Sequence, residues 1–276
     1  MAVFSLTRPE LEQLIQQLTV AASSEGQVAA KRIVFPPENQ NLEPAFSSLH
    51  RWPDVQRLAR LIDHTMLRAE APSAQIEAFC REAASLNVAA ACVHPTWVSL
   101  AVRLLHSSLV KVCSVVGFPS GATLSSAKKA EAEAAIRAGA EELDMVVNIG
   151  ALRSGNFALV ESDIRGVVEI AHASGCITKV ILENAYLADD QKIAGCRIAQ
   201  LAGADFVKTS TGFAPSGATE ADVRLMRETV GPHMGVKAAG GIRTLQDALR
   251  MLEAGADRLG SSSSVSILEE AARLIG

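Results

Sequence analysis

Three lysines stand at matching places in three short apolar segments, an arrangement that could serve chemistry on carbonyl compounds. The segments are Ile177-Thr-Lys179-Val-Ile, Phe206-Val-Lys208-Thr-Ser and Gly235-Val-Lys237-Ala-Ala. Their spacing is regular, since 208 − 179 = 29 and 237 − 208 = 29. This interval fits one strand followed by one helix, so the lysines are expected at equivalent positions on three consecutive strands.

Converging ammonium groups would make one of these amines reactive. A lone strand lysine could form a structural ion pair, but three in register favour a shared position in the mouth of a barrel. Each positive charge there disfavours protonation of its neighbour, and partial burial acts in the same direction. An uncharged amine can attack a carbonyl, and the resulting Schiff base is an electron sink for carbon–carbon cleavage. The pattern therefore predicts an imine-forming lyase, without showing which lysine is the nucleophile.

The elements that would hold these lysines alternate along the chain. β-Rich runs occupy residues 61–67, 88–93, 111–117, 143–149, 178–183, 206–211, 235–240 and 258–262. Ala-rich helical stretches such as 127–138, 158–173 and 244–254 lie between them. This alternation predicts an α/β fold, specifically a (β/α)8 TIM barrel. A doubly wound open sheet is disfavoured because no G-x-G-x-x-G turn follows the first strand.

The ends of the predicted units and of the domain can also be read from the sequence. Ala-Gly-Ala followed by an acidic residue occurs at 138–141, 202–205 and 254–257, each time before a strand, where Gly can end a helix in the left-handed conformation. Residues 1–50 differ from the rest, with a helical pattern and then a stretch dense in Pro and Asn. We expect residues 1–50 to be a helix plus a connector for capping or subunit contact, and residues 51–276 to be the barrel domain.

Composition narrows the class of protein. The formal net charge of −4 gives no reason to expect a nucleic-acid partner. Five cysteines without a C-x-x-C pair favour a reduced compartment over a disulfide framework. No apolar run approaches a membrane span, and the acidic N-terminus does not suit a signal peptide. We therefore expect a cytoplasmic protein that does not bind membranes.

Six segments in order resemble the deoxyribose-phosphate aldolase family, over about residues 61–263. They are Leu61-Ile-Asp-His-Thr65, Val116-Gly-Phe-Pro-Ser-Gly121, Glu142-Leu-Asp-Met-Val-Val-Asn148, Thr178-Lys-Val-Ile-Leu-Glu183, Val207-Lys-Thr-Ser-Thr-Gly212 and Val236-Lys-Ala-Ala-Gly-Gly-Ile-Arg-Thr244. The resemblance implies a class I, metal-independent lyase without a cofactor. Its reaction would be reversible cleavage of 2-deoxy-D-ribose 5-phosphate into D-glyceraldehyde 3-phosphate and acetaldehyde, with small aldehydes and sugar phosphates as its partners.

Roles for single residues are also carried over from the resemblance. Lys179 would form the Schiff base, and Lys208 would be the proton donor or acceptor whose positive charge lowers the pKa of Lys179. Asp144 would be a second proton donor or acceptor. Supporting places in the same polar network would fall to Asp63, Lys237 and Cys92.

Loops after the seventh and eighth predicted strands suit a phosphate group. Such loops, together with a helix N-terminus, form the usual phosphate site in these barrels, because their backbone amides can approach the anion. The candidate phosphate-binding residues are Gly212, Gly240, Gly241, Gly260, Ser262 and Ser263.

Three other readings compete with this one. They are a transaldolase-like lysine-dependent aldolase, a non-catalytic sugar-phosphate-binding barrel and a metal-dependent aldolase. No metal is expected, since the six histidines show no H-x-x-x-H spacing. The resemblance also suggests a homo-oligomer, either dimer or tetramer. Asn184 replaces the Thr that the family commonly carries beside Glu183, which puts a hydrogen bond near the imine in doubt.

Overall fold

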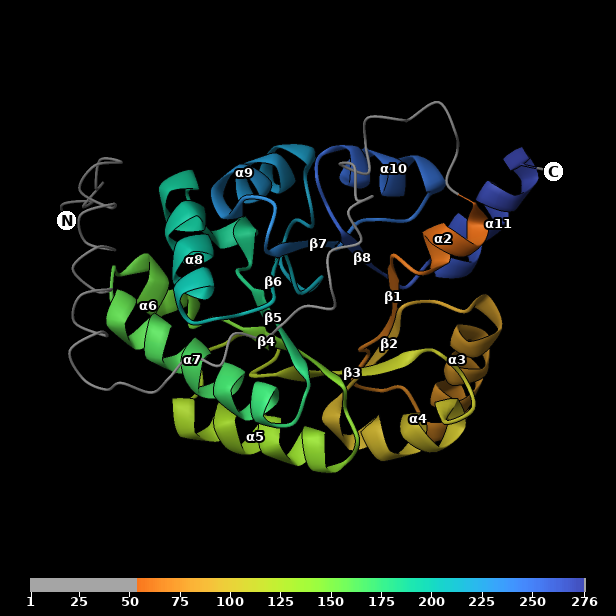
Figure 1. Ribbon diagram of the computed structural model, residues 1–276, viewed down its shortest axis with the longest axis horizontal. Helices are drawn as coiled ribbons and strands as arrows, with labels where there is room; N and C mark the ends of the chain where they lie inside the picture. Colours follow the sequence, from red (N-terminus) through yellow and green to blue (C-terminus); the bar gives the residue numbers. More distant parts are fainter. Residues whose placement is uncertain (1–53, 276) are drawn as a thin grey trace.

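Eight parallel strands close into a barrel in the computed structural model, which describes residues 54–275 (Figure 1). Each strand pairs with the next, and β8 returns to pair with β1. The strands are β1 (Ile62–Met66), β2 (Ala90–Val93), β3 (Lys111–Val116), β4 (Glu142–Val146), β5 (Ile177–Ile181), β6 (Phe206–Lys208), β7 (Gly235–Ala239) and β8 (Arg258–Ser261). The predicted (β/α)8 barrel is confirmed, whereas the helix and connector expected over residues 1–50 lie outside the described residues.

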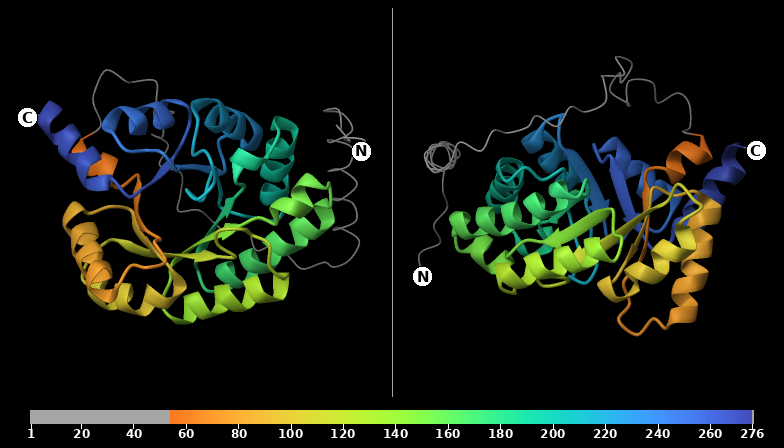
Figure 2. Two further views of the ribbon diagram at one scale, coloured as in Figure 1. Left: turned by 180° about the vertical axis from the view of Figure 1, so that it is seen from behind. Right: turned by 60° about the horizontal axis from the view of Figure 1, so that its bottom comes forward.

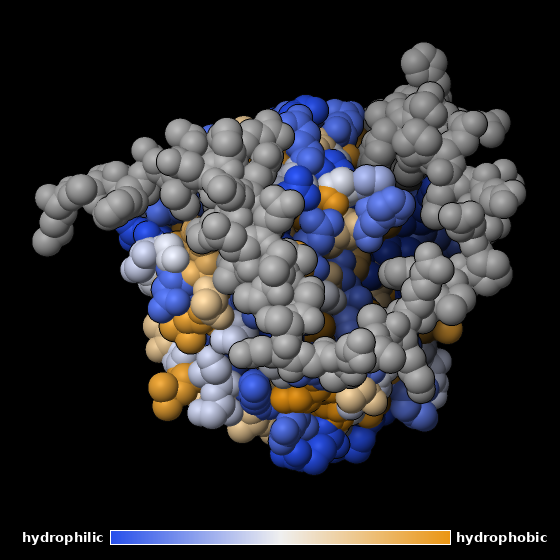
Figure 3. Space-filling model, turned by 60° about the vertical axis from the view of Figure 1, so that its left-hand side comes forward, coloured by the Kyte–Doolittle hydropathy of each residue, from blue (hydrophilic) through white to orange (hydrophobic). Residues whose placement is uncertain are grey.

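Helices surround the barrel on its outer face, as the two views of Figure 2 show. The α-helices are α2 (Val55–Ala59), α3 (Ser73–Leu86), α4 (Val98–Leu105), α5 (Ser125–Arg137), α6 (Ile149–Arg153), α7 (Phe157–Ala173), α8 (Asp189–Leu201), α9 (Glu220–Val230), α10 (Leu245–Glu253) and α11 (Ser264–Ile275). Two short 3₁₀ helices, η1 (Pro95–Trp97) and η2 (Asn184–Tyr186), follow β2 and β5. In the face shown in Figure 3, small hydrophobic patches are interspersed among hydrophilic residues, as expected for the outer sides of amphipathic helices.

The strands are buried on both faces, which explains their nearly continuous apolar composition. Outward-facing aliphatic side chains pack against the helices in the main hydrophobic core, which includes Leu143, Val180 and Val236. Side chains alternate between the two faces of a strand, so the neighbours of these residues, among them Asp144, Lys179 and Lys237, point into the barrel. The polar site is therefore enclosed by an aliphatic shell.

Two strands end three residues earlier than the sequence-based prediction. The fourth strand stops at Val146 rather than continuing to residue 149, because Asn148 caps α6: its Oδ1 accepts a hydrogen bond from the Ala151 amide at 3.0 Å. The sixth strand stops at Lys208 rather than residue 211. Both early ends leave residues free to form loops at the carboxyl edge of the barrel.

The three Ala-Gly-Ala repeats end helices as predicted. Gly139, Gly203 and Gly255 have φ values of 104°, 84° and 109°, a region that side chains with a Cβ rarely adopt. Each follows the last residues of α5, α8 or α10 and leads directly into the next strand. The repeats thus mark equivalent corners of the barrel.

Candidate active site

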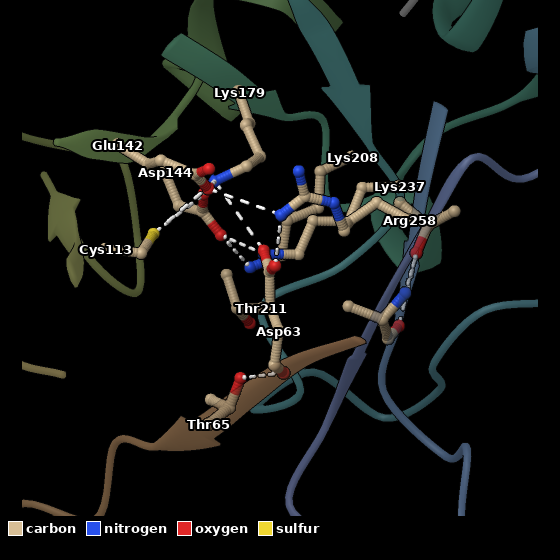
Figure 4. Close-up of polar contacts among 12 residues, drawn as sticks. Asp63, Thr65, Cys113, Glu142, Asp144, Lys179, Lys208, Thr211, Lys237 and Arg258 are labelled. Carbon is tan, nitrogen blue, oxygen red and sulfur yellow. Dashed lines mark hydrogen bonds and ion pairs between the residues drawn. The ribbon is translucent and has the colours of Figure 1, made fainter. Parts of the chain in front are cut away.

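Asp144 lies at the centre of a buried polar network inside the barrel (Figure 4). Its Oδ1 accepts a hydrogen bond from Lys179 Nζ at 2.8 Å. Its Oδ2 accepts from both Lys208 Nζ and Lys237 Nζ, each at 2.7 Å. One carboxylate therefore binds all three of the lysines that the sequence pattern singled out.

Two further carboxylates and an arginine complete the network. Asp63 on β1 accepts from Lys237 and from Arg258 Nη1, the latter at 2.6 Å. Glu142 Oε2 lies 2.6 Å from Lys179 Nζ and 3.5 Å from Arg258 Nη1, in ion-pair contact rather than in well-aligned hydrogen bonds. The predicted supporting places of Asp63 and Lys237 in this network agree with the geometry, whereas sequence reasoning missed Glu142 and Arg258.

The network contains one more positive group than negative groups. Its cations are Lys179, Lys208, Lys237 and Arg258. Its anions are Asp63, Glu142 and Asp144. Counting each group as charged gives 4 − 3 = +1, so the loss of one lysine proton would leave the network neutral. A buried group of charges is least costly when it is balanced.

Charge pairing dominates the ionisation of this network. Burial alone would raise the pKa of Asp144, but the positive charges of Lys179, Lys208 and Lys237 outweigh it and hold that pKa well below its usual range. The pKa of Asp63 is lowered in the same way, with burial opposed chiefly by Lys237 and Lys179. Both carboxylates are therefore ionised at neutral pH.

The expectation that positive neighbours lower the pKa of Lys179 is wrong. Burial acts in that direction, but the nearby carboxylates, Asp144 foremost, raise the pKa of Lys179 well above its usual value. Lys179 has three carboxylates within 3.6 Å of its Nζ, and its side chain is 0% exposed. In the free protein these carboxylates therefore favour the charged form of Lys179.

Strand register explains why the three lysines differ in position. In the β5–β6 pair Lys208 lies opposite Ile181, whereas Lys179 lies two residues earlier, opposite Phe206. Lys208 is also the last residue of its strand. The equal spacing of 29 residues in sequence thus places Lys179 deeper in the barrel than Lys208. Only Lys208 of the three reaches the cavity described next.

A cavity of ≈ 550 Å³ opens at the carboxyl edge of the barrel beside Lys208. Its lining includes five of the six predicted phosphate-binding residues: Gly212, Gly240, Gly241, Gly260 and Ser262. Ser263 does not line it; its amide donates to Ser261 Oγ at 2.9 Å instead. Ser261, Arg68 and Arg243 also line the cavity, although sequence reasoning did not select them. For Arg243, its position two residues after the Gly-Gly pair was an available signal.

Glu183 is a further residue that sequence reasoning missed as part of the site. It has φ 59° and ψ 64°, a left-handed conformation that is costly for a residue with a side chain. Its buried carboxylate accepts from the Thr211 amide and hydroxyl, and Thr211 lines the cavity. Burial raises the pKa of Glu183. The strained backbone thus places a carboxylate where it fixes the loop after β6.

Two other predicted positions are not in direct contact with the cavity. Cys92 is fully buried and packs with Cys113 in a small interior cluster, and neither cysteine lines the cavity. The side-chain amide of Asn184 donates from Nδ2 to Met226 Sδ in α9 at 3.3 Å. The Asn184 side chain therefore contacts a helix and not a lysine of the network. Cys113 is the cysteine that does contact the network, with its Sγ 3.3 Å from Asp144 Oδ1.

Cys92, Cys113 and Asp144 together have the donor types of a metal site, with ligand atoms within 4.8 Å of one another. Their surroundings do not fit a cation, however, because both Asp144 oxygens already accept hydrogen bonds from lysine ammonium groups. Burial and the hydrogen bond to Cys92 also raise the pKa of Cys113 well above its usual value, which opposes formation of the thiolate that a metal requires.

Comparison with known proteins identifies the family. A sequence model of the DeoC/LacD family aldolases matches residues 57–269. The chain belongs to this aldolase family. Deoxyribose-phosphate aldolase of Streptococcus pneumoniae serotype 19F is 57% identical over 214 residues, which cover 77% of this chain and 96% of the relative. The Lysinibacillus sphaericus enzyme of the same name is 53% identical over 213 residues, covering 77% and 95%.

Solved structures of the family agree with the fold. The tetrameric deoxyribose phosphate aldolase from Aeropyrum pernix superposes with a TM-score of 0.77 at 36% identity, covering 82% of this chain and 95% of that one. An aldolase called QR15 gives a TM-score of 0.75 at 40% identity, with coverage of 79% and 98%. The chain is therefore a lyase of the class I aldolase type. Within residues 54–275, no helix is both long enough and apolar enough to cross a bilayer.

The stability of this aldolase in acid should depend on the carboxylates whose pKa values are lowered in the folded protein. An unfolded Asp has a pKa of about 3.9, so below pH 4 the unfolded chain binds protons that folded Asp63 still excludes. The stabilisation is fully present above that pH and is lost as pH falls through the folded pKa. We expect the free energy of unfolding in urea to fall less steeply between pH 4 and pH 2 in Asp63→Asn than in the unsubstituted protein. Equal slopes would contradict this assignment.

Proposed function

We propose that this aldolase reversibly cleaves 2-deoxy-D-ribose 5-phosphate into D-glyceraldehyde 3-phosphate and acetaldehyde through an imine on Lys179. The observation that carries the proposal is that Lys208, which binds the same Asp144 carboxylate as Lys179, lines the same cavity as the glycine and serine loops after β7 and β8. Loop amides at that edge of a barrel suit a phosphate group, and Arg243 adds a positive charge. The named relatives act on deoxyribose phosphate, which fits an amine and a phosphate site in one cavity.

Lys179 is the proposed nucleophile because it stands in the Thr178-Lys-Val-Ile-Leu-Glu183 segment, which by the resemblance carries the Schiff-base lysine. Its Nζ has three carboxylates within 3.6 Å, so a proton acceptor is at hand when its ammonium group gives up a proton to attack an aldehyde. Lys208 shares Asp144 with Lys179 and lines the cavity, which suits the role of proton donor or acceptor between the substrate and the network.

The steps follow from this placement. The uncharged Lys179 amine adds to the C1 aldehyde, and loss of water gives a protonated imine. A base removes the C3 hydroxyl proton, the C2–C3 bond breaks, and its electron pair moves into the imine to form an enamine as the triose aldehyde leaves. Protonation of the enamine at its former C2 and hydrolysis release acetaldehyde and regenerate the amine. Asp144, 2.7 Å from Lys208 Nζ, is placed to exchange protons during loss of water.

Trapping the imine tests the nucleophile directly. Borohydride reduction in the presence of acetaldehyde should add an ethyl group to Lys179, which peptide mass spectrometry can locate. Lys208 lies in another segment, so the two possible adducts are resolved by the peptide that carries the added mass. An adduct on Lys208 would overturn the assignment of roles, and the absence of any adduct would argue against the imine mechanism itself.

Chelation should leave the reaction intact, since every step uses only side chains of this chain. We expect activity in EDTA to equal the activity in buffer alone, and added Zn²⁺ or Mg²⁺ to cause no stimulation. Loss of activity in EDTA that is restored by one of these ions would point to a metal-assisted reaction instead.

The setting of the enzyme is also part of the proposal. We propose a cytoplasmic homo-oligomer, dimer or tetramer, with residues 1–50 as a segment separate from the barrel domain at 51–276. Support for a reducing compartment comes from five free, buried cysteines, and support for assembly from the tetrameric relative of Aeropyrum pernix. Light scattering coupled to size exclusion, on the full chain and on a chain starting at residue 51, tests both the assembly and the segment's part in it.

A further inference from the structure

A chain of polar contacts links β1 to the start of α11 on the outer side of the barrel. His64 faces away from the lysine network, where its Nδ1 lies 2.9 Å from Ser264 Oγ. Its Nε2 lies 2.8 Å from Glu82 Oε1, an ion-pair contact without good hydrogen-bond alignment. The ring stacks on Phe79 of α3 with centroids 4.4 Å apart. His64 and Ser264 are both buried, so these contacts are held within the packed shell.

This series of polar contacts ends at the loops assigned to phosphate binding. The Ser264 hydroxyl donates to the Ser261 carbonyl at 3.2 Å. If Ser264 donates there, its oxygen accepts from His64 Nδ1. In the tautomer whose Nε2 donates to Glu82, Nδ1 instead accepts from the Ser264 hydroxyl, so the contact between Nδ1 and Oγ holds Ser264 in either case. Ser261 in turn joins the two loops: its Oγ donates to the Ile242 carbonyl at 2.8 Å and accepts from the Ser263 amide. Both Ser261 and Ile242 line the cavity.

The strand pairing places His64 level with Ser261 on the neighbouring strand. His64 is opposite Ser261 in the β1–β8 pair and opposite Ala91 in the β1–β2 pair. The neighbours it contacts or pairs with are thus uncharged apart from Glu82, whose side chain is 45% exposed. The His64 ring thus lies between strand β1 and the serine turn at the start of α11.

We propose that His64 is a positioning residue for the substrate phosphate, acting through Ser264 on the turn at residues 261–263. The inference rests on the proposed function, because it requires the phosphate to bind at this turn. Without Nδ1, Ser264 Oγ loses a buried partner and its hydroxyl is no longer held beside the Ser261 carbonyl. The backbone amides of the turn then lose the fixed geometry that phosphate recognition needs. The lysines belong to other strands and contacts, so the chemical step is spared.

Substrate selectivity separates this role from general stabilisation. The measured quantity is the ratio of kcat/KM for 2-deoxy-D-ribose 5-phosphate to kcat/KM for 2-deoxy-D-ribose, which lacks the phosphate. We expect His64→Leu and Ser264→Ala to lower this ratio roughly tenfold, through KM for the phosphorylated substrate, with the unphosphorylated reaction nearly unchanged. The double variant should be no worse than either single variant, because both break the same contact.

Two amide variants at His64 provide matched controls. Asn places its polar atoms near the position of Nδ1 and can still donate to Ser264, whereas Gln places them near Nε2 and can reach only Glu82. The selectivity ratio should therefore be largely retained in His64→Asn and lost in His64→Gln, even if both are somewhat less stable. Inhibition by inorganic phosphate should weaken in parallel with the loss of the ratio.

The outcomes distinguish this inference from the proposed function. Equal losses for both substrates, or equal behaviour of the Asn and Gln variants, would overturn the positioning role and leave His64 as a packing residue. An unsubstituted enzyme that shows no preference for the phosphorylated substrate would instead overturn the phosphate site, whatever the variants do.

Discussion

Replacing Lys179 by methionine should lower kcat/KM for 2-deoxy-D-ribose 5-phosphate by at least about 10⁴-fold, because removal of a covalent nucleophile costs a factor of this order or more. The chain should remain folded. Methionine fills a similar volume, and loss of one cation changes the buried network from four positive and three negative groups to three of each. Steady-state kinetics and urea unfolding on the same preparation measure the two effects separately.

Lys208→Met is the matched control for that variant. It removes the same charge from the same network, but from the position beside the cavity, where Asp144 is the carboxylate in contact with Lys208. We expect it to turn over slowly, to be more stable than Lys179→Met, in which Glu142 keeps only Arg258 at 3.5 Å as a charged partner, and still to form the reducible adduct with acetaldehyde. If Lys179→Met forms the adduct and Lys208→Met does not, the two roles are reversed.

Asp144→Leu should lower the free energy of unfolding by about 3–5 kcal/mol, the cost of removing one partner from buried ion pairs. The substitution leaves Lys208 without its carboxylate contact and reduces those of Lys179 and Lys237. Urea or guanidinium unfolding at neutral pH measures the change, and activity should fall with it because Asp144 exchanges protons with Lys208.

A double variant shows whether the loss comes from uncompensated charge. Asp144→Leu combined with Lys208→Met removes the lysine that would be left without a partner, so part of the lost stability should return. The sign of this coupling is the decisive result. The proposal would be contradicted if the two substitutions lowered the free energy of unfolding additively, or if the single variant lost less than about 1 kcal/mol. Either result would mean that Lys208 is not destabilised by the loss of its carboxylate partner.

Much of the barrel was predictable from local sequence. Each strand is a short apolar run, and the Gly of each Ala-Gly-Ala repeat fixes a helix end, so the eight units could be located without long-range information. The interior position of Lys179, Lys208 and Lys237 also followed from their register with apolar neighbours. These features depend on residues close together in the chain.

The depth of each lysine was not predictable, because it depends on how strands are staggered. An interval of 29 residues is compatible with any stagger, and the β5–β6 pairing sets Lys179 two residues below the level of Lys208. That offset leaves Lys208 beside the cavity and Lys179 surrounded by carboxylates. Glu142 and Arg258 were missed for a related reason, since each gains its role from strands remote in sequence.

The pairing of β1 with β8 has a consequence for synthesis of the protein. Asp63 is translated 174 residues before Lys237 and 195 residues before Arg258, its two closest cationic partners. A nascent chain therefore carries a first strand whose edge toward β8 is unpaired, with an interior carboxylate, until almost the whole polypeptide has left the ribosome. We expect ring closure to be a late event that is slowed by the long loop it must form. We therefore expect the time for which the nascent chain needs chaperones to be set by the synthesis of β8 rather than of β1.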